Sequence, residues 1–461
     1  MKRNQLEFME KWFARSQRKP LVIRGARQVG KSTLVKLFAQ QIQTTLNEVN
    51  LDRYPNLNSV FATKDPKLIL AEIESLPKMP SITDNSLLFL DEIQSAGEAL
   101  PALRYFYEEC KNLPVVAAGS LLEFLLVDHK FSMPVGRIEY LQMGPLVFTE
   151  FLDALGEAQL LKVVKNHSLG QSIGTVAHNR LLHLVRTYFF VGGMPEAVKK
   201  YCETMKLQDA SDVHQSILDT YRDDFPKYTG SRNLSRMIHV FSHAAKILGK
   251  KVKYSSFSHR DQSATIKTDI ELLCLARLLT KVTHSNGNGI PLLAEANDKI
   301  YKLLFLDIGL SNAILGLNWN AISSLSGDHL INEGPLAEQF VGQHLHDLFM
   351  NTNQRDLHYW HREGKDSNAE VDFLGAFGGR VIPIEVKAGN SGTLKSLHQF
   401  MGEKKGTLAI RLDTNTPSIQ RIQTTIRVGN ESKPACYDLI SIPLYLVEKI
   451  PELVENYFSI T

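Results

Sequence analysis

The sequence predicts an α/β chain whose amino-terminal part is a parallel sheet flanked by helices. An apolar strand at residues 21–23 runs into a glycine-bounded loop, which is followed by a helical segment from Thr33 to about Gln40. A second apolar strand, at residues 87–90, ends in two carboxylates. Further apolar strands alternate with helices, and strands alternating with helices indicate a parallel sheet. The two further strands are at residues 46–51 and 114–118, and the helices are at residues 6–13, 66–76 and 99–110.

The loop after the first strand has the pattern G-x-x-x-x-G-K-S, which is typical of phosphate binding. Its backbone N–H groups form a nest for an anion, and the positive end of the following helix dipole points at the same place. Lys31 is expected to contact the β- and γ-phosphates, and the Ser32 hydroxyl to ligate Mg²⁺. The sequence therefore predicts an ATP site formed by Gly25, Ala26, Arg27, Gln28, Val29, Gly30, Lys31, Ser32 and Thr33.

Two carboxylates at the end of the second strand complete this predicted site. Ligands bind at the carboxyl ends of strands in an open α/β sheet. Asp91 is expected to hold Mg²⁺ directly or through water, and Glu92 to orient or deprotonate the attacking water. Ser120 follows the strand at residues 114–118 and is expected to sense the γ-phosphate or hold the water, although a small residue closing a turn is the alternative.

An arginine precedes the last strand expected in this sheet, at residues 136–141. Arginines supplied to the γ-phosphate stabilise charge in phosphoryl transfer and often come from a neighbouring subunit. Arg137 is the candidate for this role, and a homo-oligomer is then expected. The alternative is an ordinary surface arginine.

Composition predicts an ordinary soluble protein. The chain has 461 residues, of which 43% are hydrophobic and 22% charged, with a net charge of +3. This charge is too small to imply nucleic-acid binding by itself. Four well-separated cysteines argue against a zinc site or a disulfide framework and favour a reducing cytoplasm. The most apolar stretch, residues 113–127, is too short to span a bilayer, so no membrane partner is expected.

Residues 157–320 contain helical patterns followed by a hairpin signal. A helical connector or lid is expected at residues 157–235. Helices near residues 238–248 and 264–279 then precede an extended segment, a turn at Asn286-Gly287 and a second extended segment at residues 291–293. This order predicts a winged helix-turn-helix at residues 236–320, a module that commonly contacts DNA. Residues 246–302 hold ten Lys and Arg against five Asp and Glu, which supports DNA as a partner, whereas a protein–protein spacer is the alternative.

Carboxylates and a lysine cluster in the C-terminal region, residues 321–461. Glu338 lies in a helical run, and Asp372 and Glu385 lie on two strand-like segments separated by Gly378-Gly379. Glu385 and Lys387 are two residues apart, so both project from one face of a strand. Such carboxylates are expected to hold one or two divalent metals, with Lys387 activating water. This pattern resembles the PD-(D/E)XK nuclease superfamily and implies a restriction-endonuclease-like α/β domain, either as a live nuclease or as an inactive scaffold.

The whole chain also resembles a family of predicted AAA-type ATPases from bacteria and archaea. The resemblance rests on the loop and carboxylate motifs above and on further short motifs, namely Ala118-Gly119-Ser120, Gly136-Arg137, Gly192-Gly193-Met194-Pro195-Glu196 and Leu306-Asp307-Ile308-Gly309-Leu310. It implies ATP binding by a P-loop ATPase domain at residues 1–156. The expected function is a DNA-acting, Mg-ATP-hydrolysing ATPase with catalytic residues Glu92, Ser120, Arg137, Asp372, Glu385 and Lys387. The alternative is a nucleotide-controlled switch whose nuclease-like domain only binds partners.

Overall fold

The computed structural model describes residues 1–120, 122, 134, 136–229, 233–317, 334–352, 354–362, 368–387, 393–428 and 431–460. The chain folds into two units, each with its own sheet. Unit 1 comprises Met1–Pro145 and Leu275–Leu278, and unit 2 comprises Leu146–Cys274 and Leu279–Thr461.

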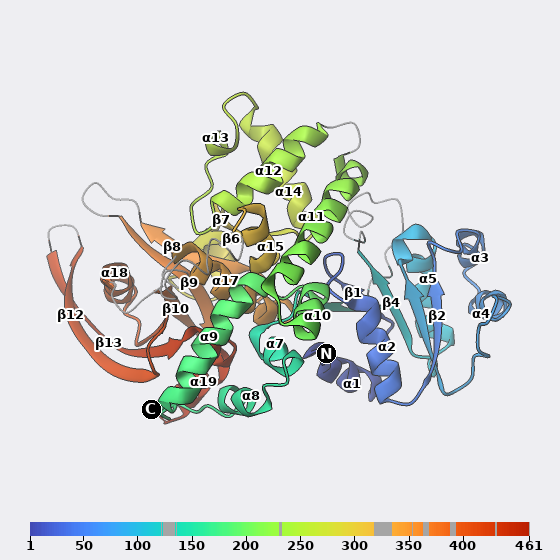
Figure 1. Cartoon of the computed structure of the whole chain (residues 1–461), viewed down its shortest axis with the longest axis horizontal. Helices are drawn as coiled ribbons and strands as arrows, with labels where there is room; N and C mark the ends of the chain where they lie inside the picture. Colours follow the sequence, from blue (N-terminus) through green and yellow to red (C-terminus); the bar gives the residue numbers. More distant parts are fainter. Residues whose placement is uncertain are drawn as a thin grey trace. The chain divides into compact units, whose positions relative to one another are not determined.

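Unit 1 is built on a five-stranded sheet in the order β2-β3-β4-β1-β5, and all of its strand pairs are parallel. The strands and helices alternate along the chain, which confirms the α/β fold with a parallel sheet (Figure 1). The elements are α1 (Gln5–Phe13), β1 (Leu21–Arg24), α2 (Lys31–Gln41), β2 (Thr45–Asn50), α3 (Leu57–Phe61), α4 (Pro66–Glu74), β3 (Ser86–Asp91), η1 (Ile93–Ser95), α5 (Ala99–Glu109), β4 (Val115–Gly119) and β5 (Glu139–Gln142).

Strand β3 forms the centre of the unit 1 core. All of its residues are buried, as expected of a parallel strand covered on both faces. Leu88 and Leu90 pack in one cluster with residues of α3, α4 and α5. Leu87 and Phe89 alternate with them and point to the opposite face, where α2 packs against β2, β3 and β4.

The parallel register places three strand ends at one edge of this sheet. Arg24 at the end of β1 pairs with Gly119 at the end of β4, and Leu90 of β3 pairs with Ala117 of β4. The segments that follow β1, β3 and β4 therefore all leave the sheet at the carboxyl ends of its strands.

Unit 2 has helices around a mixed sheet. Its first helices are α7 (Phe148–Ala154), α8 (Ala158–Lys165), α9 (Thr175–Val191), α10 (Pro195–Thr204), α11 (Leu207–Thr229), α12 (Leu234–Lys246), α13 (Tyr254–Phe257) and α14 (Ser263–Leu275). The later helices are η2 (Leu292–Glu295), α15 (Ile308–Ile314), α17 (Gly334–Met350), α18 (Lys395–Lys404), η3 (Leu444–Lys449) and α19 (Ile450–Ile460). Apolar spacing at residues 181–189 and a helical run at residues 211–221 predict α9 and α11, and the patterns given above predict α12, α14 and α17, but none predicts α7, α8 or α10.

The unit 2 sheet has eight strands in the order β12-β13-β11-β10-β9-β8-β6-β7. The strands are β6 (Leu279–Ser285), β7 (Ala296–Phe305), β8 (Leu357–Arg362), β9 (Ala369–Phe377), β10 (Arg380–Val386), β11 (Leu408–Asp413), β12 (Ser418–Val428) and β13 (Glu431–Pro443). Helix α18 packs against β9, β12 and β13 (Figure 1). The predicted hairpin around Gly378-Gly379 is present as β9 and β10.

The predicted winged-helix hairpin has a different form from the one expected. Its second strand is β7, which begins at Ala296, and the predicted extended segment at residues 291–293 instead leads into η2. The connection is closed by the Ser285 hydroxyl, which donates to the Leu292 carbonyl at 2.9 Å, and by the Asn288 amides, which donate to Glu295. Strand β6 also pairs in parallel with β8, so the hairpin continues the C-terminal sheet. The winged-helix assignment stays a prediction.

A buried aspartate ties the motifs Gly192-Gly193 and Leu306–Leu310 together in unit 2. The Asp307 carboxylate accepts hydrogen bonds from the Gly193 N–H at 2.6 Å, the Leu310 N–H at 3.1 Å and the Gln343 amide at 3.3 Å. A Cβ at Gly192 would lie 2.1 Å from the same carboxylate, so only glycine fits there. Burial raises the pKa of Asp307 to about 6, although these hydrogen bonds act to lower it. These motifs therefore have a structural role.

In the helices that the structure describes, no segment combines the length and the apolar character that crossing a membrane requires.

Replacing Asp307 by alanine is expected to lower the free energy of unfolding by about 3 kcal/mol or more, because two buried backbone N–H groups lose their acceptor and a cavity forms. Urea denaturation followed by circular dichroism measures this loss. Asp298→Ala is the matched control, since Asp298 is exposed on β7 and should change the free energy by less than about 0.5 kcal/mol. Equal losses in the two variants would contradict this role of Asp307.

Candidate nucleotide site and carboxylate cluster

The backbone of the loop between β1 and α2 leaves no room for a side chain at Gly25 and has positive φ angles at two later positions. Gly25 approaches the end of β5 so closely that a Cβ would lie 2.1 Å from the Met143 carbonyl oxygen. Gln28 and Gly30 have positive φ angles of 63° and 93°, and α2 begins at the next residue, Lys31. The loop is therefore a tight nest that ends at a helix amino terminus, which is the arrangement expected for a phosphate site.

Arg3 holds this loop from the amino terminus of the chain. Its guanidinium is buried and donates to the carbonyls of Val29 at 3.0 Å and Gly144 at 2.7 Å. One carbonyl belongs to the loop and the other to the segment after β5. Arg3 thus fixes the loop against its own sheet, a role that the sequence analysis missed because nothing local to residues 1–5 indicates it.

Lys31 lies inside the nest. It is 8% exposed, and its ammonium donates to the carbonyls of Gly25 at 3.1 Å and Ala26 at 2.7 Å. Burial lowers the pKa of Lys31 to about 8, although the carboxylates of Glu92 and Asp91 oppose this shift. Among the described residues its hydrogen-bond partners are these two neutral carbonyls, so an anionic phosphate would be a better partner for the ammonium.

The two residues predicted to hold Mg²⁺ are hydrogen-bonded to each other. The Ser32 hydroxyl donates to Asp91 Oδ2 at 2.8 Å, and burial raises the pKa of Asp91. A hydroxyl and a carboxylate side by side are the oxygen ligands that Mg²⁺ takes in nucleotide sites. The residues present therefore fit Mg²⁺ at this place.

Glu92 adopts a left-handed backbone conformation, with φ of 51°, directly after β3. Its Oε2 accepts a hydrogen bond from the Gln94 amide at 2.5 Å and from the Ser120 hydroxyl at 3.5 Å. Gln94 lies over Gly119, where a Cβ would come within 2.2 Å of its side-chain oxygen. The predicted residues Glu92 and Ser120 are thus brought together, and Gln94 is an additional residue at this site.

Arg137 lies near the start of β1, at the end of the sheet opposite the phosphate loop. It precedes β5, whose first residue Glu139 pairs with Leu21 at the start of β1. Its guanidinium donates to Glu108 at 3.0 Å and lies 5.8 Å from the Tyr107 ring. Arg137 therefore lies away from the phosphate loop of its own sheet. A role on a neighbouring copy of the chain stays a prediction, and an ordinary surface arginine paired with Glu108 stays the alternative.

In unit 2, the predicted C-terminal residues gather around a lysine that the sequence analysis did not select. Lys302 is 1% exposed, and its ammonium lies 2.7 Å from Glu338, 2.5 Å from Glu370 and 3.8 Å from Asp372. Burial would lower the pKa of Lys302, but these three carboxylates outweigh it and raise the pKa well above its usual value. A lone lysine in the apolar run of residues 301–305 was the available sequence signal.

The other two predicted residues pair with each other. Lys387 lies 2.5 Å from Glu385, and Asp372 accepts a hydrogen bond from the Val386 N–H at 2.8 Å. Burial raises the pKa of both Glu385 and Glu338, while their lysine partners oppose the shift. We refer to Lys302, Glu338, Glu370, Asp372, Glu385 and Lys387 as the carboxylate cluster.

The arrangement of the carboxylate cluster does not fit a bound metal. Within the described residue ranges, no three His, Cys, Asp or Glu side chains are grouped so that they could hold a metal ion. Two ammonium groups instead make the close contacts to the carboxylates that a cation would make. No metal-dependent step is therefore derived for Glu338, Asp372 or Glu385.

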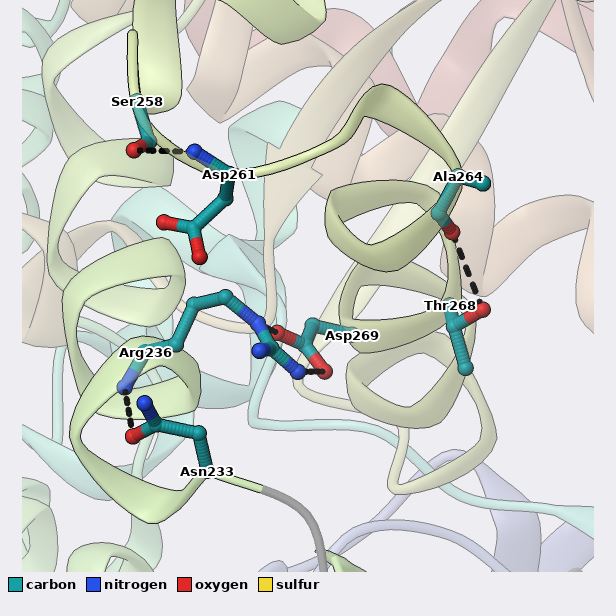
Figure 2. Close-up of polar contacts among 7 residues, drawn as sticks. All are labelled: Asn233, Arg236, Ser258, Asp261, Ala264, Thr268 and Asp269. Atoms are coloured by element: carbon teal, nitrogen blue, oxygen red, sulfur yellow. Dashed lines mark hydrogen bonds and ion pairs between the residues drawn. The ribbon is translucent and has the colours of Figure 1, made fainter.

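Helices α12 and α14, predicted to contact DNA, are joined by a buried ion pair. Figure 2 shows the Arg236 guanidinium pointing at Asp269, with Nε at 2.6 Å and Nη2 at 3.4 Å from its oxygens. Asn233 caps α12 by accepting from the Arg236 N–H at 3.1 Å. An open hollow of about 400 Å³ lies beside them, lined in part by Thr265 and Thr268. Because Asp269 already holds it, Arg236 is a structural residue rather than a phosphate ligand.

Comparisons with known proteins agree with the geometry of unit 1. Residues 17–152 match a family model described as an AAA domain. Residues 182–321 and 333–429 each match a model described as a domain of unknown function. Each model covers less than half of the chain. No match is found among curated proteins. The parallel sheet, the loop geometry and the AAA match together support an AAA-type P-loop ATPase.

Several solved structures show a distant likeness to this chain. A Walker-type ATPase of Pyrococcus abyssi is 14% identical, with a TM-score of 0.40, over 68% of this chain and 94% of that one. The ORC2 protein of Aeropyrum pernix is 13% identical, with a TM-score of 0.34, over 70% and 95% of the two chains. The RuvB Holliday junction branch migration motor of Thermotoga maritima is 14% identical, with a TM-score of 0.28, over 60% and 87%. These scores are too low to carry an argument about function.

The lowered pKa of Lys31 predicts how ATP binding depends on pH. A triphosphate binds the charged lysine, so above pH 8 binding must be accompanied by proton uptake. We expect the association constant for ATP to fall by up to about tenfold per pH unit above this value. Calorimetric titrations across this range measure the effect, and Lys31→Arg is expected to flatten it because arginine keeps its charge. An affinity that does not change with pH would contradict the prediction.

Proposed function

We propose that this protein is an ATPase that binds and hydrolyses Mg-ATP in unit 1. The hydrogen bond of 2.8 Å between Ser32 and Asp91 carries the proposal, because it joins the phosphate loop to the carboxylate strand. Neither motif alone makes a catalytic site. Their contact supports a single site at one edge of the sheet, with Lys31, Asp91 and Glu92 around it.

The proposed chemistry assigns one task to each side chain. The Lys31 ammonium exchanges its backbone carbonyl partners for the β- and γ-phosphates, and Ser32 and Asp91 hold Mg²⁺. The metal, when bound, neutralises charge on the phosphates. Glu92 orients the attacking water and accepts its proton. Ser120, within 3.5 Å of Glu92, helps to hold that water or senses the γ-phosphate.

A second copy of the chain is part of this proposal. Arg137 is half-buried at the end of the sheet opposite the phosphate loop, beside a hollow of about 280 Å³ that is also lined by Arg18 and Lys111. This position supports a role in trans, in which Arg137 of one copy approaches the ATP of its neighbour and stabilises charge there. The active form would then be a homo-oligomer.

We further propose that DNA is the partner of unit 2 and that the protein acts in the cytoplasm. The excess of basic residues between residues 246 and 302 supports this partner. Lys250 and Lys253 are exposed, and Lys251 is half-buried with its ammonium 3.3 Å from His361. ATP hydrolysis would drive or gate the proposed winged helix and the nuclease-like C-terminal sheet.

A second candidate is a nucleotide-controlled switch whose C-terminal sheet binds partners without cutting. The position of Lys302 among Glu338, Glu370 and Asp372 favours it, because these carboxylates already have a cation. Plasmid cleavage together with DNA-stimulated hydrolysis would favour the nuclease. ATP-dependent assembly without cleavage would favour the switch.

Removing the charge of Glu92 is expected to separate ATP binding from turnover. Glu92→Gln should bind ATP like the parent protein and hydrolyse it about 10²–10⁴-fold more slowly, because the general base is lost. Lys31→Ala should abolish binding. A phosphate-release assay and calorimetry measure the two effects, and Glu72→Gln on the exposed face of α4 is the control that should change neither. ATP binding that survives Lys31→Ala would contradict the proposed site.

Reversing the charges of Lys250, Lys251 and Lys253 is expected to weaken DNA binding for every sequence. Each lost phosphate contact should reduce the slope of log K against log salt by about one. Fluorescence anisotropy with unrelated duplexes at several salt concentrations measures both quantities.

The control for this test carries the same charge change away from unit 2. Reversing Lys64, Lys67 and Lys78, which are exposed in unit 1, should leave both the affinity and the salt slope unchanged. Equal weakening in both triple variants would show a general effect of net charge, and the proposed DNA surface would be wrong.

A further inference from the structure

Lys302 occupies the centre of a group of carboxylates that come from distant parts of the chain. The lysine belongs to β7 at one edge of the eight-stranded sheet, Glu338 to α17, and Glu370 and Asp372 to β9. Strands β6 and β8 lie between β7 and β9, so the lysine side chain must extend across the face of the sheet to reach them. The position of the ammonium therefore depends on the packing of β7, α17 and β9 against one another.

The ammonium itself is buried. The Tyr359 ring on β8 is fully buried, and its centroid lies 5.0 Å from Lys302 Nζ. On the helix side, a Cβ at Gly249 would lie 2.7 Å from Glu338 Oε2, so backbone lies directly against this carboxylate. The ammonium thus lies between an aromatic face and two close carboxylates, of which Glu370 remains 40% exposed.

With these neighbours, the buried Lys302 ammonium supplies the positive charge that a metal ion would otherwise supply to the carboxylates. It lies within 4 Å of three carboxylates, two of them at 2.7 Å and 2.5 Å, and these distances are typical of strong charge-assisted contacts. Glu338 and Asp372 are two of the three residues that the sequence pattern assigns to a divalent metal. Lys302 contacts Oε1 of Glu338, so this oxygen already has a cationic partner.

We propose that the Lys302 ammonium is the built-in cation of the carboxylate cluster and takes the place of a divalent metal there. The C-terminal sheet of the natural protein then holds a nuclease-like arrangement in a closed, metal-independent form. With the lysine in place these carboxylates are not grouped to hold a metal; removal of its charge lets Glu338, Glu370 and Asp372 move together around a divalent cation. This inference concerns unit 2 alone and is independent of ATP hydrolysis in unit 1.

The test uses the nucleotide-free, full-length protein with Mn²⁺ as the probe. Lys302→Met keeps the length of the side chain and removes its charge. We expect its melting temperature to fall by about 5–15 °C, because three carboxylates lose their cation. Mn²⁺ should restore much of this loss and bind saturably in calorimetric titrations. The parent protein should show neither effect.

Two controls identify where the ion binds. Lys302→Met combined with Asp372→Asn should not regain stability with Mn²⁺, because a proposed ligand is lost. Lys281→Met removes a partly exposed lysine on the neighbouring strand β6, 3.8 Å from Glu271, and should neither lose much stability nor gain Mn²⁺ binding.

Three outcomes would overturn the proposal. The first is Mn²⁺ binding by the parent protein that Asp372→Asn abolishes, since the metal and the lysine would then coexist. The second is a folded Lys302→Met variant that gains no Mn²⁺ binding. If Lys302→Met does not fold, the charge-compensated variant Lys302→Met with Glu338→Gln is expected to fold. A failure of this variant as well would be the third outcome, because the lysine would then matter for packing and not for charge.

Discussion

The need to pair every buried charge determines the arrangement of both units. A buried ammonium or carboxylate without a partner costs several kcal/mol, so its partners must be in place for the fold to exist. In unit 1, Lys31 and Asp91 meet this need with loop carbonyls and the Ser32 hydroxyl. In unit 2, Asp307 meets it with backbone N–H groups, and Lys302 with carboxylates. The contacts of Asp91 with Ser32, of Asp307 with Gly193 and of Lys302 with its carboxylates join segments that are far apart in the sequence, whereas those of Lys31 lie within its own loop.

The architecture of unit 1 could be read from the sequence because its signals are local. The phosphate loop is continuous, strands β1, β3 and β4 are largely apolar runs, and the capping residue and proline at Asp65-Pro66 mark a helix start. The parallel register then brings the ends of β1, β3 and β4 together without any further information. Arg3 could not be found in this way, because its partner carbonyls at Val29 and Gly144 come from backbone that carries no sequence signal.

Unit 2 was less predictable because its sheet depends on contacts between distant segments. The β9–β10 hairpin was correctly predicted from a short stretch with two glycines, and α17 was predicted as a helical run around Glu338. The parallel pairing of β6 with β8 joins residues 75 positions apart in the chain, and no turn motif in the sequence indicates such a pair. The hairpin was therefore assigned to a separate module. Lys302 was overlooked for the same reason, since its partners are identified only once this sheet is assembled.

The two buried lysines differ in a way that bears on what each site can do. Among the described residues, the Lys31 ammonium donates to the neutral carbonyls of Gly25 and Ala26, and burial lowers its pKa to about 8, so a negatively charged ligand would stabilise its charge. Lys302 has carboxylate partners that raise its pKa, so its charge is already balanced and an anionic ligand would add little stabilisation. The surroundings of Lys31 therefore favour binding of an anion, and those of Lys302 do not.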